Sequence, residues 1–157
     1  MADVKEINEL FRQYGRTLGS VESFTGGLFA KEITAVSGAS HFYKGGLVTY
    51  ATEEKNRLIG IPYEVIDEFG VVSKEVASLM AANGQKTLNV DYCISFTGNA
   101  GPEAMEGKPV GEVYIAVATF NGVNVYGYQL EGSREEIQRK GVELALNFLK
   151  KSLFENN

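Results

Sequence analysis

The chain has 157 residues, of which 15 are basic and 20 acidic, and 44% are hydrophobic. This composition is typical of one globular domain, expected over residues 1–157, and its net charge of −5 argues against nucleic acid as a partner. One His and one Cys exclude a multi-histidine metal site, a cysteine zinc cage and an internal disulfide. We therefore expect no metal or other cofactor, and a cytoplasmic location.

The N-terminal sequence MADVKEINEL contains charges and no apolar stretch of the kind that secretory signals carry. The longest apolar run, residues 113–120, is far below the ~18 residues that a membrane helix needs. No membrane partner is expected.

Apolar residues recur at helical spacing over residues 3–14, and Gly15 is expected to end this helix. Residues 16–22 predict the first strand, which turns at the sequence SFTGG. A second helix is expected from residue 27 to Ser37 and Gly38. The chain thus begins with a helix, a strand and a helix.

The middle of the chain continues this alternation. Residues 46–50 predict a second strand after the KGG turn, and Thr52 is the expected N-cap of a short helix that stops at Gly60. Residues 63–69 predict another helical turn or two, and Ser73 is expected to cap a longer helix that ends near Leu88.

The last third predicts a buried strand, a loop, a hairpin and a final helix. These segments are residues 92–96, 99–109, 110–130 with its turn at Asn121-Gly122, and 133–151. Together the elements predict an α/β fold: a single three-layer α/β/α domain with a mixed sheet of about five or six strands.

Glycine contributes 18 residues, about 11% against a typical ~7%. Several glycines fall where a predicted strand meets a loop or helix, the place where open α/β sheets bind ligands. These are Gly26, Gly27, Gly45, Gly46, Gly98, Gly101, Gly107 and Gly111. The alternative is that they only serve tight turns. Neither a P-loop nor a dinucleotide-binding GxGxxG motif is present.

Ser23 begins the SFTGG sequence between a predicted strand and a helix. A serine at this position can present its hydroxyl at the edge of the sheet, while the following amides serve as donors to an oxyanion or phosphate. Simple N-capping by Ser23 or Thr25 is the alternative interpretation.

A serine nucleophile needs a base, and the sequence offers His41 or a lysine of lowered pKa. His41 lies in a polar loop, which is more typical of a surface residue. Lys55 falls in the first turn of a predicted helix, where the helix dipole disfavours a cation, although Glu53 and Glu54 oppose this effect. Tyr50 could orient the lysine or relay a proton. A solvated lysine at a helix start is the alternative interpretation.

Five sequence blocks resemble the CinA C-terminal domain family in order and approximate spacing, over about residues 5–151. They are VESFTGG, KGGLVTYATEEKNRLIGIP, GVVSKEVA, FTGNAGP and KPVGEVYIAVA. The resemblance implies nicotinamide-nucleotide amidase activity: hydrolysis of nicotinamide mononucleotide to nicotinate mononucleotide and ammonia. It also implies a homo-oligomer.

The resemblance assigns catalytic roles to Ser23 as nucleophile, Lys55 as base and Tyr50 as an assisting group. It further implies a mononucleotide site whose 5′-phosphate is held by basic residues of the last helix. The implied substrate-binding residues are Thr25, Gly26, Gly27, Gly45, Gly46, Thr97, Gly98, Ala100, Gly101, Arg134 and Arg139.

Three departures from the family pattern concern substrate fit. Phe24 replaces the usual Cys of the serine motif and is expected to reshape the pocket, Asn99 replaces an apolar residue, and residues 103–107 replace a Gly-rich stretch. These changes motivate an alternative function, a nucleotide-binding module of the same fold without amidase turnover.

Overall fold

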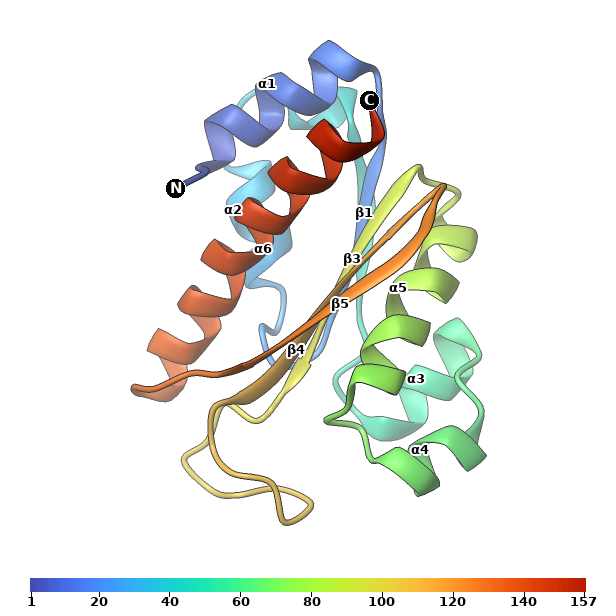
Figure 1. Ribbon diagram of the computed structural model, residues 1–157, viewed down its shortest axis with the longest axis vertical. Helices are drawn as coiled ribbons and strands as arrows, with labels where there is room; N and C mark the ends of the chain where they lie inside the picture. Colours follow the sequence, from blue (N-terminus) through green and yellow to red (C-terminus); the bar gives the residue numbers. More distant parts are fainter.

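The computed structural model describes residues 1–157 and contains one five-stranded sheet with helices on both faces (Figure 1). The helices are α1 Val4–Tyr14, α2 Leu28–Thr34, the short 3₁₀ helix η1 Ala39–His41, α3 Thr52–Ile59, α4 Tyr63–Phe69, α5 Lys74–Leu88 and α6 Arg134–Asn156. The strands are β1 Leu18–Glu22, β2 Tyr43–Val48, β3 Tyr92–Gly98, β4 Glu112–Thr119 and β5 Gly122–Gln129.

The strand order is β2-β1-β3-β4-β5. Strand β1 pairs in parallel with both β2 and β3, whereas β3–β4 and β4–β5 are antiparallel. The predicted α/β fold with a mixed sheet is therefore confirmed. The three parallel strands have their carboxyl ends at the same edge of the sheet.

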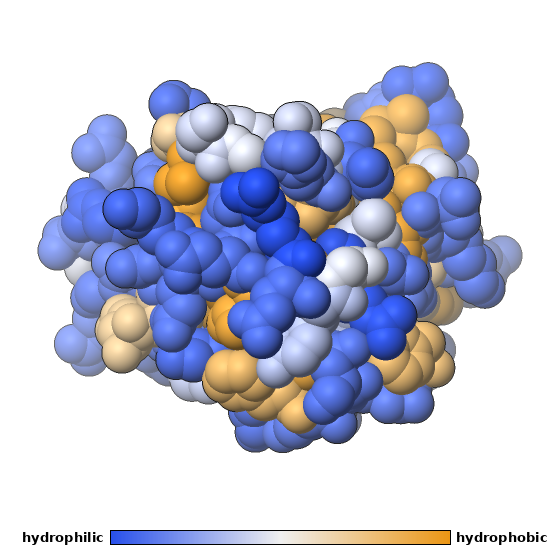
Figure 2. Space-filling model, turned by 90° about the horizontal axis from the view of Figure 1, so that it is seen from above, coloured by the Kyte–Doolittle hydropathy of each residue, from blue (hydrophilic) through white to orange (hydrophobic).

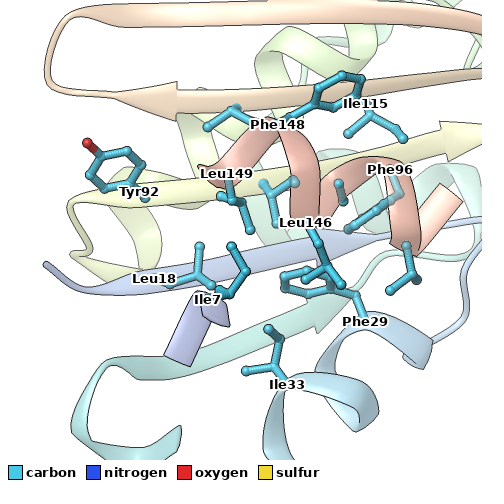
Figure 3. Packing of buried hydrophobic residues seen from close by; sticks show 14 of the residues in the cluster. Ile7, Leu18, Phe29, Ile33, Tyr92, Phe96, Ile115, Leu146, Phe148 and Leu149 are labelled. Carbon is cyan, nitrogen blue, oxygen red and sulfur yellow. The ribbon is translucent and has the colours of Figure 1, made fainter. Parts of the chain in front are cut away.

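Two hydrophobic clusters cover the two faces of the sheet. The first packs α1, α2 and α6 against one face through residues such as Ile7, Phe29 and Leu149 (Figure 3). The second packs α4 and α5 against the other face through residues such as Ile66 and Met80. Because both faces are covered, β3 is buried along almost its whole length, as its apolar sequence predicts.

The predicted helices form, with small differences at their ends. Asp3 caps α1 through its side chain and Gly15 ends it in the left-handed conformation. The predicted N-cap of α3, Thr52, is wrong by one residue. The N-cap is Ala51, whose backbone is extended and whose carbonyl oxygen accepts a hydrogen bond from the Glu54 amide. Helix α6 continues to Asn156, beyond the expected end at residue 151.

The predicted hairpin forms, but its turn lies one residue earlier than expected. Thr119 pairs with Gly122, so the loop residues are Phe120 and Asn121. The Asn121 amide donates to Thr119 Oγ1 at 3.0 Å, and Gly122 takes a φ of 121° as the first residue of β5. A side-chain acceptor and a permissive glycine together fix this turn.

No helix combines the length and the apolar composition that crossing a membrane requires. Figure 2 views the molecule from the top of Figure 1 and shows a mainly hydrophilic surface, with hydrophobic residues in small, separate groups.

Candidate active site

The carboxyl edge of the parallel strands gathers the segments that carry most of the predicted site residues. Ser23 follows β1, Thr49 and Tyr50 follow β2, and the loop 99–111 follows β3. Figure 1 shows this loop, the start of α6 and helices α3 and α4 at the lower end of the molecule. This is the edge at which open α/β sheets bind ligands.

Ser23 and Lys55 lie together at this edge although 32 residues separate them. Lys55 Nζ is 3.1 Å from Ser23 Oγ and 2.7 Å from the Thr49 carbonyl oxygen, with the Tyr50 carbonyl oxygen at 3.4 Å. Lys55 is 1% exposed and Ser23 is 9% exposed. The pair is thus shielded from water, unlike a solvated lysine at a helix start.

Burial lowers the pKa of Lys55 from its ordinary value to about 8, whereas the charges of Glu106 and Glu53 act in the opposite direction. A neutral amine has two N–H donors and one lone pair. The two carbonyl oxygens match the donors, which leaves the lone pair to accept the Ser23 proton. This arrangement suits a lysine general base.

The turn after Ser23 leaves several amides free. The Gly26 amide donates to the Ser23 carbonyl and the Leu28 amide to the Thr25 carbonyl. The amides of Phe24, Thr25 and Gly27 have no hydrogen-bond partner. They are the candidate oxyanion donors next to Ser23, whereas the amide of Gly26 is already occupied.

The side chain of Thr25 contacts Glu22, a residue that sequence reasoning missed. Thr25 Oγ1 donates to Glu22 Oε1 at 2.6 Å, and Glu22 is 1% exposed. The only signal in the sequence is a carboxylate at the end of a predicted strand, directly before the serine turn.

The hydroxyl of Tyr50 contacts α6 and not the Ser23–Lys55 pair. Arg134 Nη2 donates to Tyr50 Oη at 2.9 Å, and Arg134 Nη1 donates to the Gly101 carbonyl oxygen. Sequence reasoning also missed Gln138, whose Nε2 donates to the Phe24 carbonyl oxygen at 2.9 Å. The first turns of α6 therefore border both the serine turn and the loop after β3.

The loop after β3 is held by its own side chains. The Gly101 amide donates to Asn99 Oδ1 at 3.0 Å, and Thr97 Oγ1 donates to the Val71 carbonyl oxygen at 2.6 Å. Thr97 thus has no free hydroxyl proton to offer a ligand. Gly98 and the buried Ala100 are packing positions, since a Cβ at Gly98 would lie within 3 Å of Val113.

Residues 103–107 cross to the helical layer formed by α4 and α5. Glu106 accepts the amides of Val71 and Val72 at 2.9 and 3.1 Å, and Lys108 Nζ donates to the carbonyl oxygens of Phe69 and Val72. This segment, which replaces a Gly-rich stretch of the family pattern, is thereby fastened close enough to Lys55 to affect its pKa.

A cavity of ≈ 330 Å³ lies beside Arg134. Its other lining residues come from the loop after β3: Asn99, Gly101, Pro102, Glu103, Ala104 and Met105. A cavity of this size is at the lower end of the range for small-molecule sites.

The structure places Gly45 and Gly46 away from this edge, because β2 begins at Tyr43 and includes them. Gly46 pairs with Ser20, three residues or roughly 10 Å before Ser23. A Cβ on Gly46 would lie 2.5 Å from Ser20 Oγ, so close packing explains this glycine.

The side chains of Arg139 and Phe24 also lie away from this edge of the sheet. Arg139 lines a separate cavity of ≈ 460 Å³ with Glu32 and Glu143, so Arg134 is the basic residue of the pair that lies at this edge. Phe24 is 3% exposed and packs in the core against Phe96, with ring centroids 6.3 Å apart. Its ring therefore fills the core instead of reshaping a pocket.

The structure places no group of three or more His, Cys, Asp or Glu side chains where they could hold a metal ion.

Residues 2–153 match the CinA C-terminal domain. The chain is 40% identical over 150 residues to a putative competence-damage inducible protein of Bacillus subtilis, covering 96% of this chain and 36% of that protein. It is 43% identical over 148 residues to a CinA-like protein of Geobacter sulfurreducens, covering 94% and 36%. The chain thus spans about a third of the length of these curated relatives.

Two solved structures share the fold over nearly their full length. The competence/damage inducible protein CihA of Agrobacterium tumefaciens has a TM-score of 0.91 and 32% identity, covering 96% of this chain and 92% of that one. The competence damage-inducible protein A of Klebsiella pneumoniae has a TM-score of 0.94 and 26% identity, with 99% of each chain covered. By sequence and by structure, the chain belongs to the CinA C-terminal domain family.

Proposed function

We propose that this chain is an amidohydrolase that converts nicotinamide mononucleotide to nicotinate mononucleotide and ammonia. The observation that carries the proposal is the buried contact of 3.1 Å between Lys55 Nζ and Ser23 Oγ. The choice of substrate rests on the family resemblance, and the proposed reaction rests on the geometry of the site.

Neutral Lys55 takes the proton of Ser23 as Oγ attacks the carboxamide carbon. The free amides of the turn after Ser23 donate to the oxygen of the tetrahedral intermediate. Lys55 then returns the proton to the departing nitrogen, and the C–N bond of the tetrahedral intermediate breaks, which releases ammonia and leaves an acyl-serine ester. Water, deprotonated by Lys55, attacks this ester; the proton returns to Ser23 and the carboxylic acid product ionises.

Arg134 is the proposed ligand of the 5′-phosphate, because its guanidinium lies beside the ≈ 330 Å³ cavity at the same edge. An arginine fork suits a phosphate better than a point charge does. Tyr50 belongs to substrate binding in this proposal, since its hydroxyl accepts a hydrogen bond from Arg134.

Ammonia release from nicotinamide mononucleotide, nicotinamide riboside and free nicotinamide tests the proposal and the phosphate requirement together. We expect release from the mononucleotide without added metal and much slower release from the riboside. Ser23→Ala and Lys55→Met should each lower kcat at least 10³-fold, the order seen when a nucleophile or base is removed. Lys74→Met, an exposed lysine of α5, is the matched control and should retain wild-type rates.

Full activity in a folded Ser23→Ala protein would contradict the serine mechanism. Tight mononucleotide binding by calorimetry with no product over long incubation would instead support a binding module without turnover.

A further inference from the structure

Glu22 carries a buried carboxylate directly before Ser23. It is the last residue of β1 and is 1% exposed. Oε1 accepts the Thr25 hydroxyl at 2.6 Å and the Phe29 amide at 2.9 Å, and Oε2 accepts the Ala30 amide at 3.2 Å. Both oxygens are thus committed to groups of the chain, although Glu22 makes no salt bridge.

These three hydrogen bonds connect the residue before the serine turn to Thr25 within the turn and to the start of the helix after it. Helix α2 begins at Leu28, and its N-cap, Gly27, offers no side chain. Glu22 takes the place of a capping side chain from across the turn, and the amides at the helix start stabilise its charge. The strand before Ser23 is thereby joined to the helix that follows it.

Some backbone amides of this segment are occupied by Glu22, and others stay available to a ligand. Glu22 occupies the amides of Phe29 and Ala30, while those of Phe24, Thr25 and Gly27 have no partner. Gly26 and Gly27 both have positive φ, 57° and 102°, which glycine adopts freely, so these two residues by themselves do little to hold the turn in one conformation. Thr25 is the one turn residue whose side chain bonds directly to Glu22.

We propose that Glu22 is a positioning residue, which fixes the turn from Ser23 to Gly27 so that its free amides receive the oxyanion formed when Ser23 attacks. The inference rests on the proposed serine chemistry but not on the identity of the substrate. Glu22 itself transfers no proton, because Lys55 contacts Ser23 Oγ and both Glu22 oxygens are occupied.

Glu22→Gln tests this role, because the amide keeps the shape of the side chain but sets an NH₂ group against a backbone N–H. We expect kcat for nicotinamide mononucleotide to fall at least tenfold with KM changed less than twofold. The pH midpoint that Lys55 sets should persist, since the base is untouched. Glu32→Gln, an exposed glutamate of α2, is the matched control.

A second pair of variants guards against a folding defect in Glu22→Gln. Thr25→Ser keeps the hydroxyl that donates to Glu22 and should retain most of kcat, whereas Thr25→Val removes it and should lower kcat several-fold. Equal kcat in these two variants overturns the role of the Thr25–Glu22 bond in positioning.

The rate at which a small fluorophosphonate labels Ser23, followed by mass spectrometry, separates this inference from the choice of substrate. Labelling of the wild type but slow labelling of Glu22→Gln supports the positioning role even if nicotinamide mononucleotide is not hydrolysed, a result that would overturn only the proposed substrate. Equal labelling rates, or a wild-type Ser23 that does not react, overturn the positioning role.

Discussion

The environment of Lys55 sets the protonation state on which the proposed chemistry depends. Its ammonium group is buried with two carbonyl oxygens and the Ser23 hydroxyl, and no carboxylate forms a salt bridge with it. Burial disfavours the charged form and brings the pKa to about 8, which Glu106 limits by its opposite charge. The residue is therefore partly neutral near physiological pH.

A pH profile of kcat/KM checks this account. Because neutral Lys55 is the active form, activity should rise with pH through about 8 and then level off. Glu106→Gln removes a charge that raises the pKa of Lys55, so the midpoint should move to lower pH. Glu68→Gln, an exposed glutamate of α4 that has no part in the pKa shift of Lys55, is the control and should leave the midpoint unchanged. An upward shift in Glu106→Gln would contradict the electrostatic argument.

The sequence predicts the members of this site better than their contacts. Ser23 and Lys55 are identified by motif, but their contact depends on β1 and β2 pairing in parallel, which local patterns do not determine. Glu106 carries no local signal, because it reaches the site only when its loop crosses to Val71 and Val72. Long-range side-chain contacts were therefore the part that sequence reasoning could not supply.

Among the secondary-structure elements, periodicity predicts the helices and the hairpin, and glycine causes the main strand error. The pair Gly45-Gly46 resembles a turn, so the second strand is predicted over residues 46–50, whereas β2 spans Tyr43–Val48. In the structure the pair lies inside β2, next to a register irregularity between Leu18 and Gly19. Gly45 takes a φ of 149° there, and the close approach of Ser20 leaves no room for a Cβ on Gly46.

Helix α6 offers a test at the scale of one element, because its start carries both a capping box and Arg134. Ser133 Oγ accepts the Glu136 amide at 3.2 Å, and Glu136 Oε1 accepts the Ser133 amide at 3.0 Å. Ser133→Ala should lower the free energy of unfolding by about 1 kcal/mol. It should also raise KM for the mononucleotide more than for the riboside, since a frayed first turn loosens Arg134.

Urea unfolding and steady-state kinetics measure these two effects. Ser78→Ala is the control, because Ser78 lies within α5 and its hydroxyl donates to the Lys74 carbonyl oxygen without capping a helix. Equal changes of KM for both substrates would contradict the prediction, because they would show that the cap of α6 has no specific effect on phosphate binding.

In the whole molecule, the site is assembled from both helical layers. Lys55 comes from α3, on the side of the sheet that carries α4 and α5, while Arg134 begins α6 on the other side (Figure 1). Ser23 lies between them at the end of a central strand. The contact between Lys55 and Ser23 therefore requires that both layers stay packed on the sheet.

The two hydrophobic clusters share this sheet, so we expect them to unfold together. Met80 in one cluster and Leu149 in the other are both fully buried, and replacing either by Ala should cost about 2–5 kcal/mol. Since the chain has no Trp, near-UV circular dichroism of its tyrosines and far-UV signals report on packing and secondary structure. Both signals and the loss of activity should coincide in one urea transition for the wild type and for each variant. A Leu149→Ala protein that lost the α6 layer first, in a separate transition, would show that the layers are independent.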